Sequence, residues 1–341
     1  LLQAEKEKGN VGTSLLIMPT SLVYNWEMEA SRFTPDLRIL TYTGTLRNKD
    51  IKRFSKYDVV LTSYGITRLD IDLLKQVYFN YIILDESQVI KNPTSNIAKA
   101  VMELKSRYKL TLTGTPLENT TLDLWSQMTF INPGLLGGQT FFKNEYQQPI
   151  EKKRDEAKTK KLNSIIKPFI LRRLKSQVAT DLPEKVENVY YTNMTTEQEK
   201  KYEEVKSFYR HKILDQIDKE GINNTRMMIL EGLTKLRQIS NHPKMVDMRY
   251  EGDSGKLEDV SYMLENALLE GHKVLVFSQF VKHLGIVKAL LKERKIPFAY
   301  LDGSSTDRKE QVDKFNKDEN LKVFLISIKA GGLGLNLTEA D

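Results

Sequence analysis

Two adjacent carboxylates close an apolar run in the stretch "YIILDESQVIKN", residues 81–92. A buried carboxylate is costly unless something cationic meets it, so Asp85 and Glu86 need a partner at the end of the strand that this run predicts. Such a pair is typical of nucleotide hydrolases, in which the Asp holds Mg²⁺ through its water shell and the Glu orients or deprotonates the attacking water. Acidic residues in this position also serve as helix caps.

Two further strand ends carry small residues and glycines. "LTLTGTPLENTTLDLW" (110–125) leaves its strand through hydroxyl residues and a glycine, which let the backbone come close to the neighbouring acidic strand end. "ISIKAGGLGLN" (326–336) ends in a glycine-rich turn, which suits a bound phosphate or a closely approaching backbone and is also common in flexible turns. The residues of interest in these turns are Thr113, Gly114, Thr115, Gly331, Gly332 and Gly334.

The elements that position these residues alternate between strand and helix. Near-continuous apolar runs predict strands that are covered on both faces, and helical patterns lie between them. The predicted strands are 14–18, 58–63, 81–85, 109–114, 273–278, 298–303 and 322–327, and the predicted helices include 22–32, 94–106, 281–294 and 307–316. This alternation predicts an α/β fold with parallel sheets.

A long charged region separates the two groups of strands. Residues 195–219 predict a strong helix with Thr195 or Thr196 as its N-cap. "EKKRDEAKTKK" (151–161) is typical of a solvated helix face, and 181–191 reads as an extended crossing segment. The two groups of strands are therefore expected to form two lobes.

Composition narrows the class of protein. The 341 residues carry a formal charge of +7, which suits an anionic partner such as nucleic acid. No apolar run approaches the roughly 20 residues of a membrane span. Cysteine is absent and the four histidines have no metal-ligand spacing, so we expect neither zinc nor a disulfide.

Taken in order, the motifs resemble those of the SWI/SNF family of DNA-dependent ATPases, within helicase superfamily two. In the first half, "LLIMPTSLVYNWEMEASRF" and "VVLTSYG" are similar to segments Ia and Ib, "DESQVIKN" to motif II, and "LTGTPLENTTLDLWSQMTFINPGLLG" to motif III. "FILRRLKSQVATDLPEKVE" and "LRQISNHP" resemble the signatures between the lobes. "KVLVFSQF", "LDGSSTDRKEQVDKFN" and "LISIKAGGLGLNLTEAD" resemble motifs IV to V.

The resemblance implies two RecA-like parallel-sheet lobes with helical protrusions. It places the first lobe at 1–175 with an insertion at about 138–170, a crossing segment at 176–192, and the second lobe at 193–341 with an insertion at about 195–245. No G-x-x-x-x-G-K-[ST] occurs, and the sequence stops before the expected place of motif VI. We therefore expect a fragment without the phosphate-binding loop and arginine fingers, which alone does not turn over ATP.

The implied activity is ATP-driven tracking along double-stranded DNA, with Mg²⁺ as cofactor and a DNA-bound protein as a further target. An RNA helicase of the same superfamily is an alternative, against which the Thr-Gly-Thr-Pro of motif III and "LRQISNHP" speak. A catalytically inactive lobe pair that binds DNA or protein is another, and the intact Asp85–Glu86 pair argues against it. The expected compartment is the nucleoid-bearing cytoplasm of a bacterium, or the nucleus of a eukaryote.

The resemblance also assigns site residues. It implies that Asp85 binds Mg²⁺ and that Glu86 activates the attacking water. It also implies a role in ATP binding and coupling between motifs for Gln88 and for the residues of the two turns, Thr113, Gly114, Thr115, Gly331, Gly332 and Gly334. Gln88 stands where the family commonly has His, and we expect it to bridge to the neighbouring motif by hydrogen bonds. The implied contacts to the DNA backbone are Pro19, Thr20, Ser21, Thr62, Ser63, Lys91, Asn92, Gly303, Ser304 and Ser305.

Overall fold

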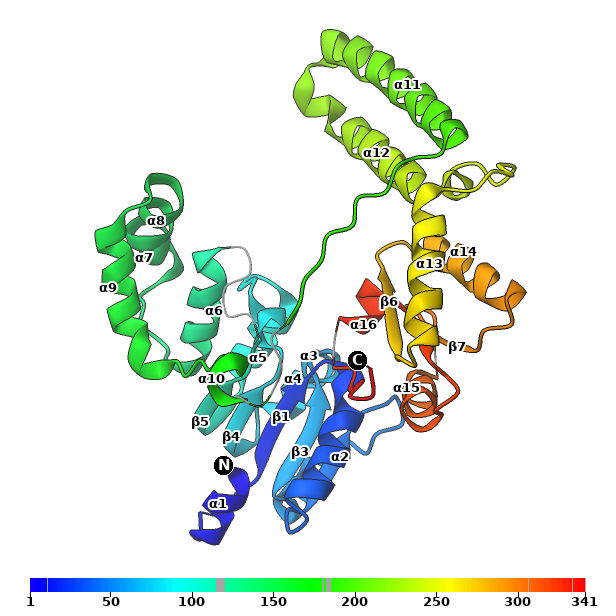
Figure 1. The fold of residues 1–341 in the computed structure, drawn as a ribbon. Helices are drawn as coiled ribbons and strands as arrows, with labels where there is room; N and C mark the ends of the chain where they lie inside the picture. The colour runs from blue at the N-terminus through cyan, green and yellow to red at the C-terminus, as the bar shows by residue number, and fades with distance from the viewer. Residues whose placement is uncertain are drawn as a thin grey trace. The chain divides into compact units, whose positions relative to one another are not determined.

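The computed structural model describes residues 1–10, 12–114, 120–179, 181, 185–305, 307–332 and 334–340. The chain forms two compact units, Leu1–Pro183 and Glu184–Asp341, which Figure 1 draws in blue to green and in green to red. Their boundary lies inside the range 176–192 of the expected crossing segment. Each unit combines helices with a parallel sheet, which confirms the predicted α/β fold class.

The sheet of the first unit has five parallel strands in the order β2-β3-β1-β4-β5. Their bounds are β1 (Ser14–Met18), β2 (Ile39–Tyr42), β3 (Val59–Ser63), β4 (Tyr78–Leu84) and β5 (Lys105–Thr111). Successive side chains of a strand point to opposite faces, and β1 shows the result. Leu15 and Ile17 enter one apolar cluster, whereas Leu16 and Met18 enter another on the opposite face.

The helices of the first unit cover the sheet and build a separate subdomain. Their bounds are α1 (Leu2–Glu7), α2 (Val23–Phe33), α3 (Tyr64–Leu69), α4 (Ile71–Leu74), α5 (Asn96–Glu103), α6 (Thr121–Ile131), α7 (Gln139–Phe142), α8 (Gln148–Lys153), α9 (Glu156–Ile166) and α10 (Lys175–Val178). Trp125 of α6 shares an apolar cluster with Phe142, Tyr146 and Leu162. This cluster gives the inserted helices α7 to α9 a core of their own.

Three strands of this sheet differ from the sequence prediction. β4 begins at Tyr78, three residues before the predicted start. β5 ends at Thr111 rather than at Gly114, and it begins at Lys105, four residues before the predicted start. Its register with β4 runs from Tyr78–Lys105 to Leu84–Thr111, so backbone pairing extends the strand through charged residues that no apolar run marks. β2 was missed because it has only four residues, of which only Tyr42 is buried.

The second unit has three parallel strands in the order β6-β8-β7. Their bounds are β6 (Val274–Ser278), β7 (Phe298–Leu301) and β8 (Val323–Ser327). The helices are α11 (Thr196–Glu220), α12 (Ile222–Asn241), α13 (Gly255–Leu269), α14 (Val281–Glu293), α15 (Arg308–Lys317) and α16 (Ile328–Gly331). The central strand β8 is buried along its whole length, as the apolar run at 322–327 predicts.

Helices α11 and α12 form an antiparallel hairpin that projects from this unit (Figure 1). Thr195 caps α11, as predicted, in a capping box with Gln198. The buried Gln198 amide also donates to the carbonyl of Ile239 over 2.8 Å and accepts from the Gly255 N–H, so one side chain joins the starts of α11 and α13 to the end of α12. Although α11 runs over 25 residues, neither it nor any other helix in the described ranges is apolar enough to cross a bilayer.

Candidate nucleotide and nucleic-acid site

The predicted site residues of the first unit lie along the carboxyl edge of its sheet. Met18 pairs with Ser63 and Ile17 with Leu84, so β1, β3 and β4 end side by side. The Asp85 N–H then donates to the Ile17 carbonyl over 2.8 Å, and the Leu112 N–H to the Leu84 carbonyl over 2.7 Å. Ligands of open parallel sheets bind at this edge, which is where the sequence placed the acidic pair.

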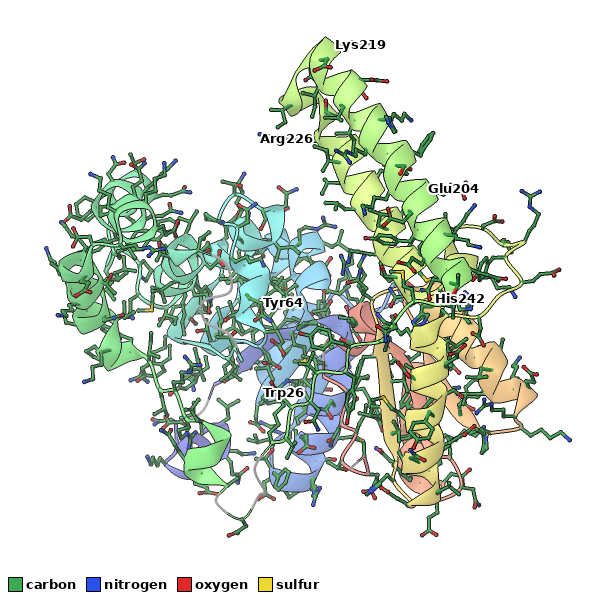
Figure 2. All side chains as sticks on the ribbon, turned by 45° about the horizontal axis from the view of Figure 1, so that its top comes forward. Trp26, Tyr64, Glu204, Lys219, Arg226 and His242 are labelled. Atoms are coloured by element: carbon green, nitrogen blue, oxygen red, sulfur yellow. The ribbon has the colours of Figure 1, made fainter. Side chains whose placement is uncertain are left out.

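The Asp85 carboxylate is half-buried and held through both of its oxygens. Its Oδ2 accepts from the indole Nε1 of Trp26 over 2.6 Å, and its Oδ1 accepts from the Glu86 backbone N–H over 2.9 Å. The backbone carbonyl of Asp85 accepts from the Tyr64 hydroxyl over 2.8 Å. Figure 2 labels Trp26 and Tyr64 on the first unit. These contacts fix both the position of the strand end and the direction of the carboxylate.

Glu86 has a left-handed backbone, with φ 50° and ψ 51°. Residues other than glycine adopt this conformation rarely and at some cost, so the turn aims the side chain in a direction that ordinary backbone does not offer. The Gln88 amide donates to Glu86 Oε2 over 2.7 Å and accepts from the Thr113 hydroxyl over 3.0 Å. The expected bridge from Gln88 to the neighbouring motif is therefore present as a hydrogen bond.

The short helix that follows the acidic pair, Ser87–Ile90, is fastened to α6. The Ser87 hydroxyl donates to the side-chain oxygen of Gln127 over 2.8 Å, and the Ser126 hydroxyl donates to the Ile90 carbonyl over 2.5 Å. All four of these residues are buried, where an unmade hydrogen bond is costly. The loop that carries Asp85 and Glu86 is therefore fixed by α6, through the short helix that follows it.

Burial shapes the electrostatics around Asp85. It raises the pKa of Tyr64, and the negative charges of Asp85 and Glu86 raise it further. Tyr64 therefore keeps its proton and remains a hydrogen-bond donor throughout the physiological range. Among the described residues no three His, Cys, Asp or Glu side chains cluster as metal ligands. A pair of carboxylates nevertheless fits Mg²⁺, which is usually bound through one or two carboxylates together with waters and phosphate oxygens.

The predicted backbone contacts of the first unit fall into two groups. Pro19, Thr20 and Ser21 follow β1, and within the described chain no side-chain hydrogen bond uses the hydroxyls of Thr20 and Ser21. Asn92 Oδ1 accepts from the N–H and the hydroxyl of Thr94, and Lys91 precedes Asn92 in the chain. These residues can donate to a phosphate.

Thr62 and Ser63 are placed differently. Thr62 is fully buried and its hydroxyl donates to the Tyr42 carbonyl over 2.8 Å, so the structure does not support its predicted DNA contact. Ser63 is also buried, and its Oγ accepts from the Ile66 N–H as the N-cap of α3. These two side chains hold the strand end and the following helix in place.

In the second unit, Gly303, Ser304 and Ser305 follow β7 at the carboxyl edge of the sheet. The hydroxyls of Ser304 and Ser305 both donate to Oδ1 of Asp302, over 2.6 and 3.4 Å. The side-chain hydrogen bond from Ser304 is the main reason that the pKa of Asp302 is lowered despite its burial. A phosphate at this turn would meet hydroxyls that already have an acceptor, so the DNA contact of these residues remains a prediction.

The glycine-rich turn after β8 has a packing requirement of its own. A Cβ on Gly331 would lie 2.7 Å from Ile326 Cγ2 and 2.9 Å from Phe277 Cε1, so a side chain at this position requires these neighbours to shift. Gly334 has φ 63°, the left-handed region that favours glycine. Gly332 and Gly114 have no such positive φ, and Thr115 lies outside the described residues. The role of these turns in ATP coupling therefore stays a prediction.

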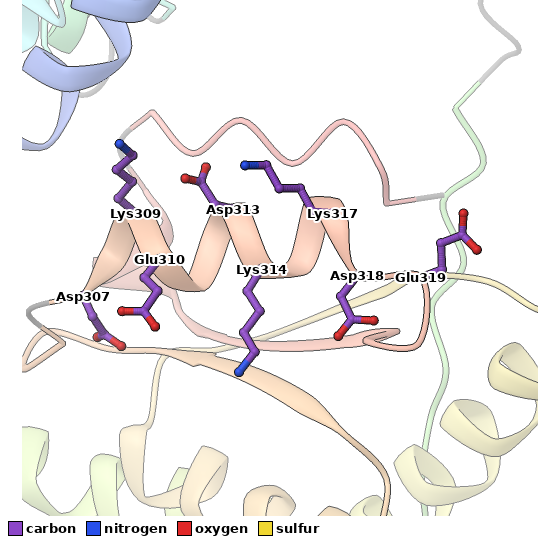
Figure 3. Close-up of a pocket in the computed structure, with 8 residues that line it drawn as sticks. All are labelled: Asp307, Lys309, Glu310, Asp313, Lys314, Lys317, Asp318 and Glu319. Carbon is purple, nitrogen blue, oxygen red and sulfur yellow. The ribbon is translucent and has the colours of Figure 1, made fainter.

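A shallow hollow along α15 holds charged side chains only. Figure 3 shows Lys309, Asp313 and Lys317 projecting from one side of the helix and Glu310 and Lys314 from the other. Opposite charges four residues apart are typical of a solvated helix face. The sequence placed no site here, and the structure gives no reason to add one.

The sequence missed two residues of the acidic site, Trp26 and Tyr64. Both lie in stretches that were quoted for their motifs, but an aromatic residue at a helix start predicts core packing rather than a contact to a carboxylate. They come close to Asp85 only because β1 pairs with β4 on one side and with β3 on the other. The signal that could have identified them is an aromatic residue with an N–H or O–H donor that follows another predicted strand of the same sheet.

Comparison with known proteins gives consistent matches along the chain. Residues 1–245 match the SNF2-related domain, and residues 255–341 match the helicase conserved C-terminal domain. The putative ATP-dependent helicase/translocase YwqA of Bacillus subtilis is 36% identical over 351 residues, which cover 98% of this chain and 37% of that protein. The ISWI chromatin-remodeling complex ATPase ISW1 of Saccharomyces cerevisiae is 32% identical over 350 residues, which cover 97% of this chain and 31% of that protein. The chain thus spans about a third of the length of these relatives.

A solved structure gives a similar match. The Sulfolobus solfataricus SWI2/SNF2 ATPase core in complex with dsDNA is 38% identical, with a TM-score of 0.51, and the match covers 99% of this chain and 72% of that one. A second structure, the Sulfolobus solfataricus SWI2/SNF2 ATPase core domain, is 40% identical, with a TM-score of 0.50, and the match covers 99% of this chain and 70% of that one.

Proposed function

Because the chain belongs to the SNF2-related domain family, we propose that it forms the motor core of an ATP-driven translocase on double-stranded DNA, of the SWI/SNF type. Such a motor hydrolyses ATP to move along the duplex and to displace or remodel bound protein. Relatives described as a helicase/translocase and as a chromatin-remodeling ATPase support this proposal, as does a structural neighbour solved with dsDNA. Because the proposed substrate is DNA, we infer that the motor works at the nucleoid in the cytoplasm of a bacterium, or in the nucleus of a eukaryote.

The observation that carries the proposal is the acidic pair, which is oriented from several sides at the carboxyl edge of a parallel sheet. Asp85 would hold Mg²⁺ through the water shell of the ion, with Trp26 fixing the direction of the carboxylate. The ion, when bound beside the nucleotide phosphates, neutralises charge that develops during phosphoryl transfer. Glu86 orients the attacking water and accepts its proton.

Gln88 couples two strand ends in this proposal. One end of its amide holds the Glu86 carboxylate and the other end meets Thr113, at the end of the next strand. A shift of the Thr113 turn is transmitted to the catalytic carboxylate through two hydrogen bonds. Gln88 is therefore a positioning residue that couples the state of one strand end to hydrolysis at another.

The DNA contacts would come from backbone-directed donors, since movement along a duplex requires contacts that do not depend on sequence. Thr20, Ser21, Lys91 and Asn92 are the residues that we propose for this role in the first unit. They follow β1 and the acidic loop, so the nucleotide edge and the DNA surface share elements.

ATP hydrolysis by the intact protein, with duplex DNA, RNA or no nucleic acid, tests the proposal. We expect duplex DNA to stimulate turnover regardless of sequence, with single-stranded and double-stranded RNA much less effective. Equal stimulation by RNA would instead indicate an RNA helicase of the same superfamily. Absence of ATPase activity under all three conditions would indicate a binding module and would contradict the proposal.

A further inference from the structure

Helix α15 holds the glycine-rich turn after β8 at both of its ends. In the first turn of the helix, Arg308 Nη2 donates to the Ala330 carbonyl over 3.2 Å. In its last turn, Asn316 Nδ2 donates to the Asn336 carbonyl over 3.0 Å. The two donors stand two helical turns apart, which is about 12 Å along the axis of an α-helix. The exposed glycines lie in the chain between the two acceptors.

Apolar packing joins the same two segments between these hydrogen bonds. Phe315 of α15 and Ala330 of α16 are buried in one cluster, and Val312, Leu335 and Leu337 pack against it. Val312 and Phe315 lie between the two donors in the sequence, and the two leucines flank the second acceptor. Helix α15 and the residues on either side of the turn therefore form one packed body.

The start of the turn is fixed to the sheet as well. Ser327, the last residue of β8, accepts from the Ala330 N–H through its Oγ and so caps α16. Gly331 lies against the sheet, where a Cβ would meet two side chains. Gly332 and Gly334 follow and are exposed. The turn thus has fixed ends and exposed glycines between them, so the position of the ends limits where the glycines can move.

Arg308 and Asn316 are suited to hold backbone carbonyls. In the part of the chain that the structure describes, no carboxylate pairs with Arg308, so its charge is available to the last turn of α16. The final carbonyls of a helix have no partner within it, and a cation beside them is favourable. Asn316 Oδ1 is buried without a hydrogen-bond partner, which costs free energy, so the amide is retained for its N–H donor to Asn336.

The same helix begins directly after the turn Gly303–Ser305, for which a DNA contact is predicted. Arg308 stands three residues after Ser305 in the chain. Gln311, in the second turn of the helix, accepts from the Tyr300 N–H over 3.4 Å and ties the helix to β7. A displacement of the Gly303–Ser305 turn therefore moves the first turn of α15, and with it the donor that holds Ala330.

We propose that Arg308 and Asn316 are positioning residues that make α15 the link between the Gly303–Ser305 turn and the glycine-rich turn. A ligand at the first turn then changes the setting of the second, to which the family resemblance assigns ATP coupling. The proposal rests on the proposed function and deepens it, because it names residues of the second unit through which DNA raises ATP turnover. Each of the two side chains acts through a backbone carbonyl of the glycine-rich turn.

Steady-state ATPase of the intact protein, with and without duplex DNA, tests the proposal together with the affinity for the same DNA. In Arg308→Gln the ratio of DNA-stimulated to basal kcat should fall about tenfold, the scale of one lost hydrogen bond from a charged donor, with DNA affinity changed by less than about twofold. Asn316→Ala removes a neutral donor, so the ratio should fall about threefold. Arg308→Lys can still donate to the Ala330 carbonyl and should restore most of the stimulation.

Lys314→Gln is the matched control, because it removes one exposed positive charge from the same helix, on the side opposite Lys317 (Figure 3). If the ratio in Arg308→Gln stays at the parental value, or falls no more than in this control, the link is overturned. A loss of stimulation with an equal loss of DNA affinity also overturns it, since Arg308 would then be a DNA contact. A parent protein whose turnover ignores duplex DNA contradicts the proposed function itself. Thermal unfolding shows which variants are folded, and Asn316→Ala with Arg308→Lys completes the test should Arg308→Gln not fold.

Discussion

The indole N–H of Trp26 donates to Oδ2 of Asp85 over 2.6 Å, across 59 residues of sequence. Trp26 lies on α2, which follows β1, and β1 pairs directly with β4, whose end carries Asp85. A hydrogen bond to a charged acceptor contributes more than one between neutral groups, about 1.5–3 kcal/mol when it is not exposed to solvent. The carboxylate assigned to Mg²⁺ is therefore held in one direction before any ligand arrives.

Trp26→Phe removes the indole N–H and keeps an aromatic ring against the sheet. In the variant Asp85 keeps only the hydrogen bond from the Glu86 N–H and can rotate, so ATP turnover of the intact protein should fall about tenfold with a weaker response to Mg²⁺ concentration. Steady-state ATPase at several Mg²⁺ concentrations measures both effects. The second tryptophan, Trp125, donates instead to the Gly137 carbonyl in the core of the inserted helices, so Trp125→Phe is the control. A Mg²⁺ dependence that changes equally in both variants would contradict a specific role for Trp26.

Gln88→Ala separates the catalytic carboxylate from the end of β5. Glu86 would lose its donor, and the Thr113 hydroxyl would lose the acceptor that Gln88 provides. In the intact protein hydrolysis should therefore fall by about 10-fold, with nucleotide binding nearly unchanged. Nucleotide binding and turnover, measured on the same preparation, distinguish positioning from binding. Gln76→Ala, at an exposed site where the amide donates to the Asp72 carbonyl, should alter neither. Loss of nucleotide affinity in proportion to turnover would argue against the coupling role.

The parts of this fold that the sequence predicted are those set by local apolar pattern. β1 and β8 are buried throughout, and continuous apolar runs marked them within one residue of their bounds. β5 was misplaced because backbone pairing with β4, rather than side-chain burial, decides where an exposed and charged strand begins. A register between strands is a property of the assembled sheet and leaves no trace in a single run of residues.

The candidate site shows the same division. The acidic pair could be found from sequence because it follows an apolar run and stands in order with the other motifs that resemble the family. The Trp26 contact, the Gln88 bridge to Thr113 and the burial of Thr62 depend on which strand ends become neighbours. The pairing order β2-β3-β1-β4-β5 determines all three, and the sequence order of the strands does not reveal it.

The stability of the second unit should depend on pH through His283. Burial, with the charges of Lys256 and His242, lowers its pKa in the folded protein to about 4, from about 6.5 for an exposed histidine. The unfolded chain therefore binds this proton first as the pH falls, so the contribution to stability is complete above about pH 6.5 and is lost progressively between there and about pH 4. Between pH 7 and pH 5 we expect a loss of about 2 kcal/mol in the free energy of unfolding from this group.

His283→Gln, compared with the parent by denaturant unfolding at the two pH values, measures this contribution. The variant should lose the pH-dependent part, whereas His272→Gln, at a half-exposed side chain, should keep it. Equal pH dependence in the parent and in His283→Gln would show that the buried imidazole does not control the loss.

The division of labour between the two adjacent carboxylates gives the last prediction. Glu86→Gln keeps the size and hydrogen bonding of the side chain but removes the base and the negative charge beside the attacking water. In the intact protein ATP binding should survive, while hydrolysis falls about 10²-fold or more, the scale of a lost general base. Asp85→Asn should also weaken Mg-ATP binding, because it removes charge beside the ion and leaves Trp26 facing a neutral amide. DNA affinity without nucleotide should barely change in either variant, since neither side chain is a proposed phosphate donor. Nucleotide binding and turnover, measured together for both variants, decide the matter: hydrolysis by Glu86→Gln at near the parental rate would show that another group activates the water.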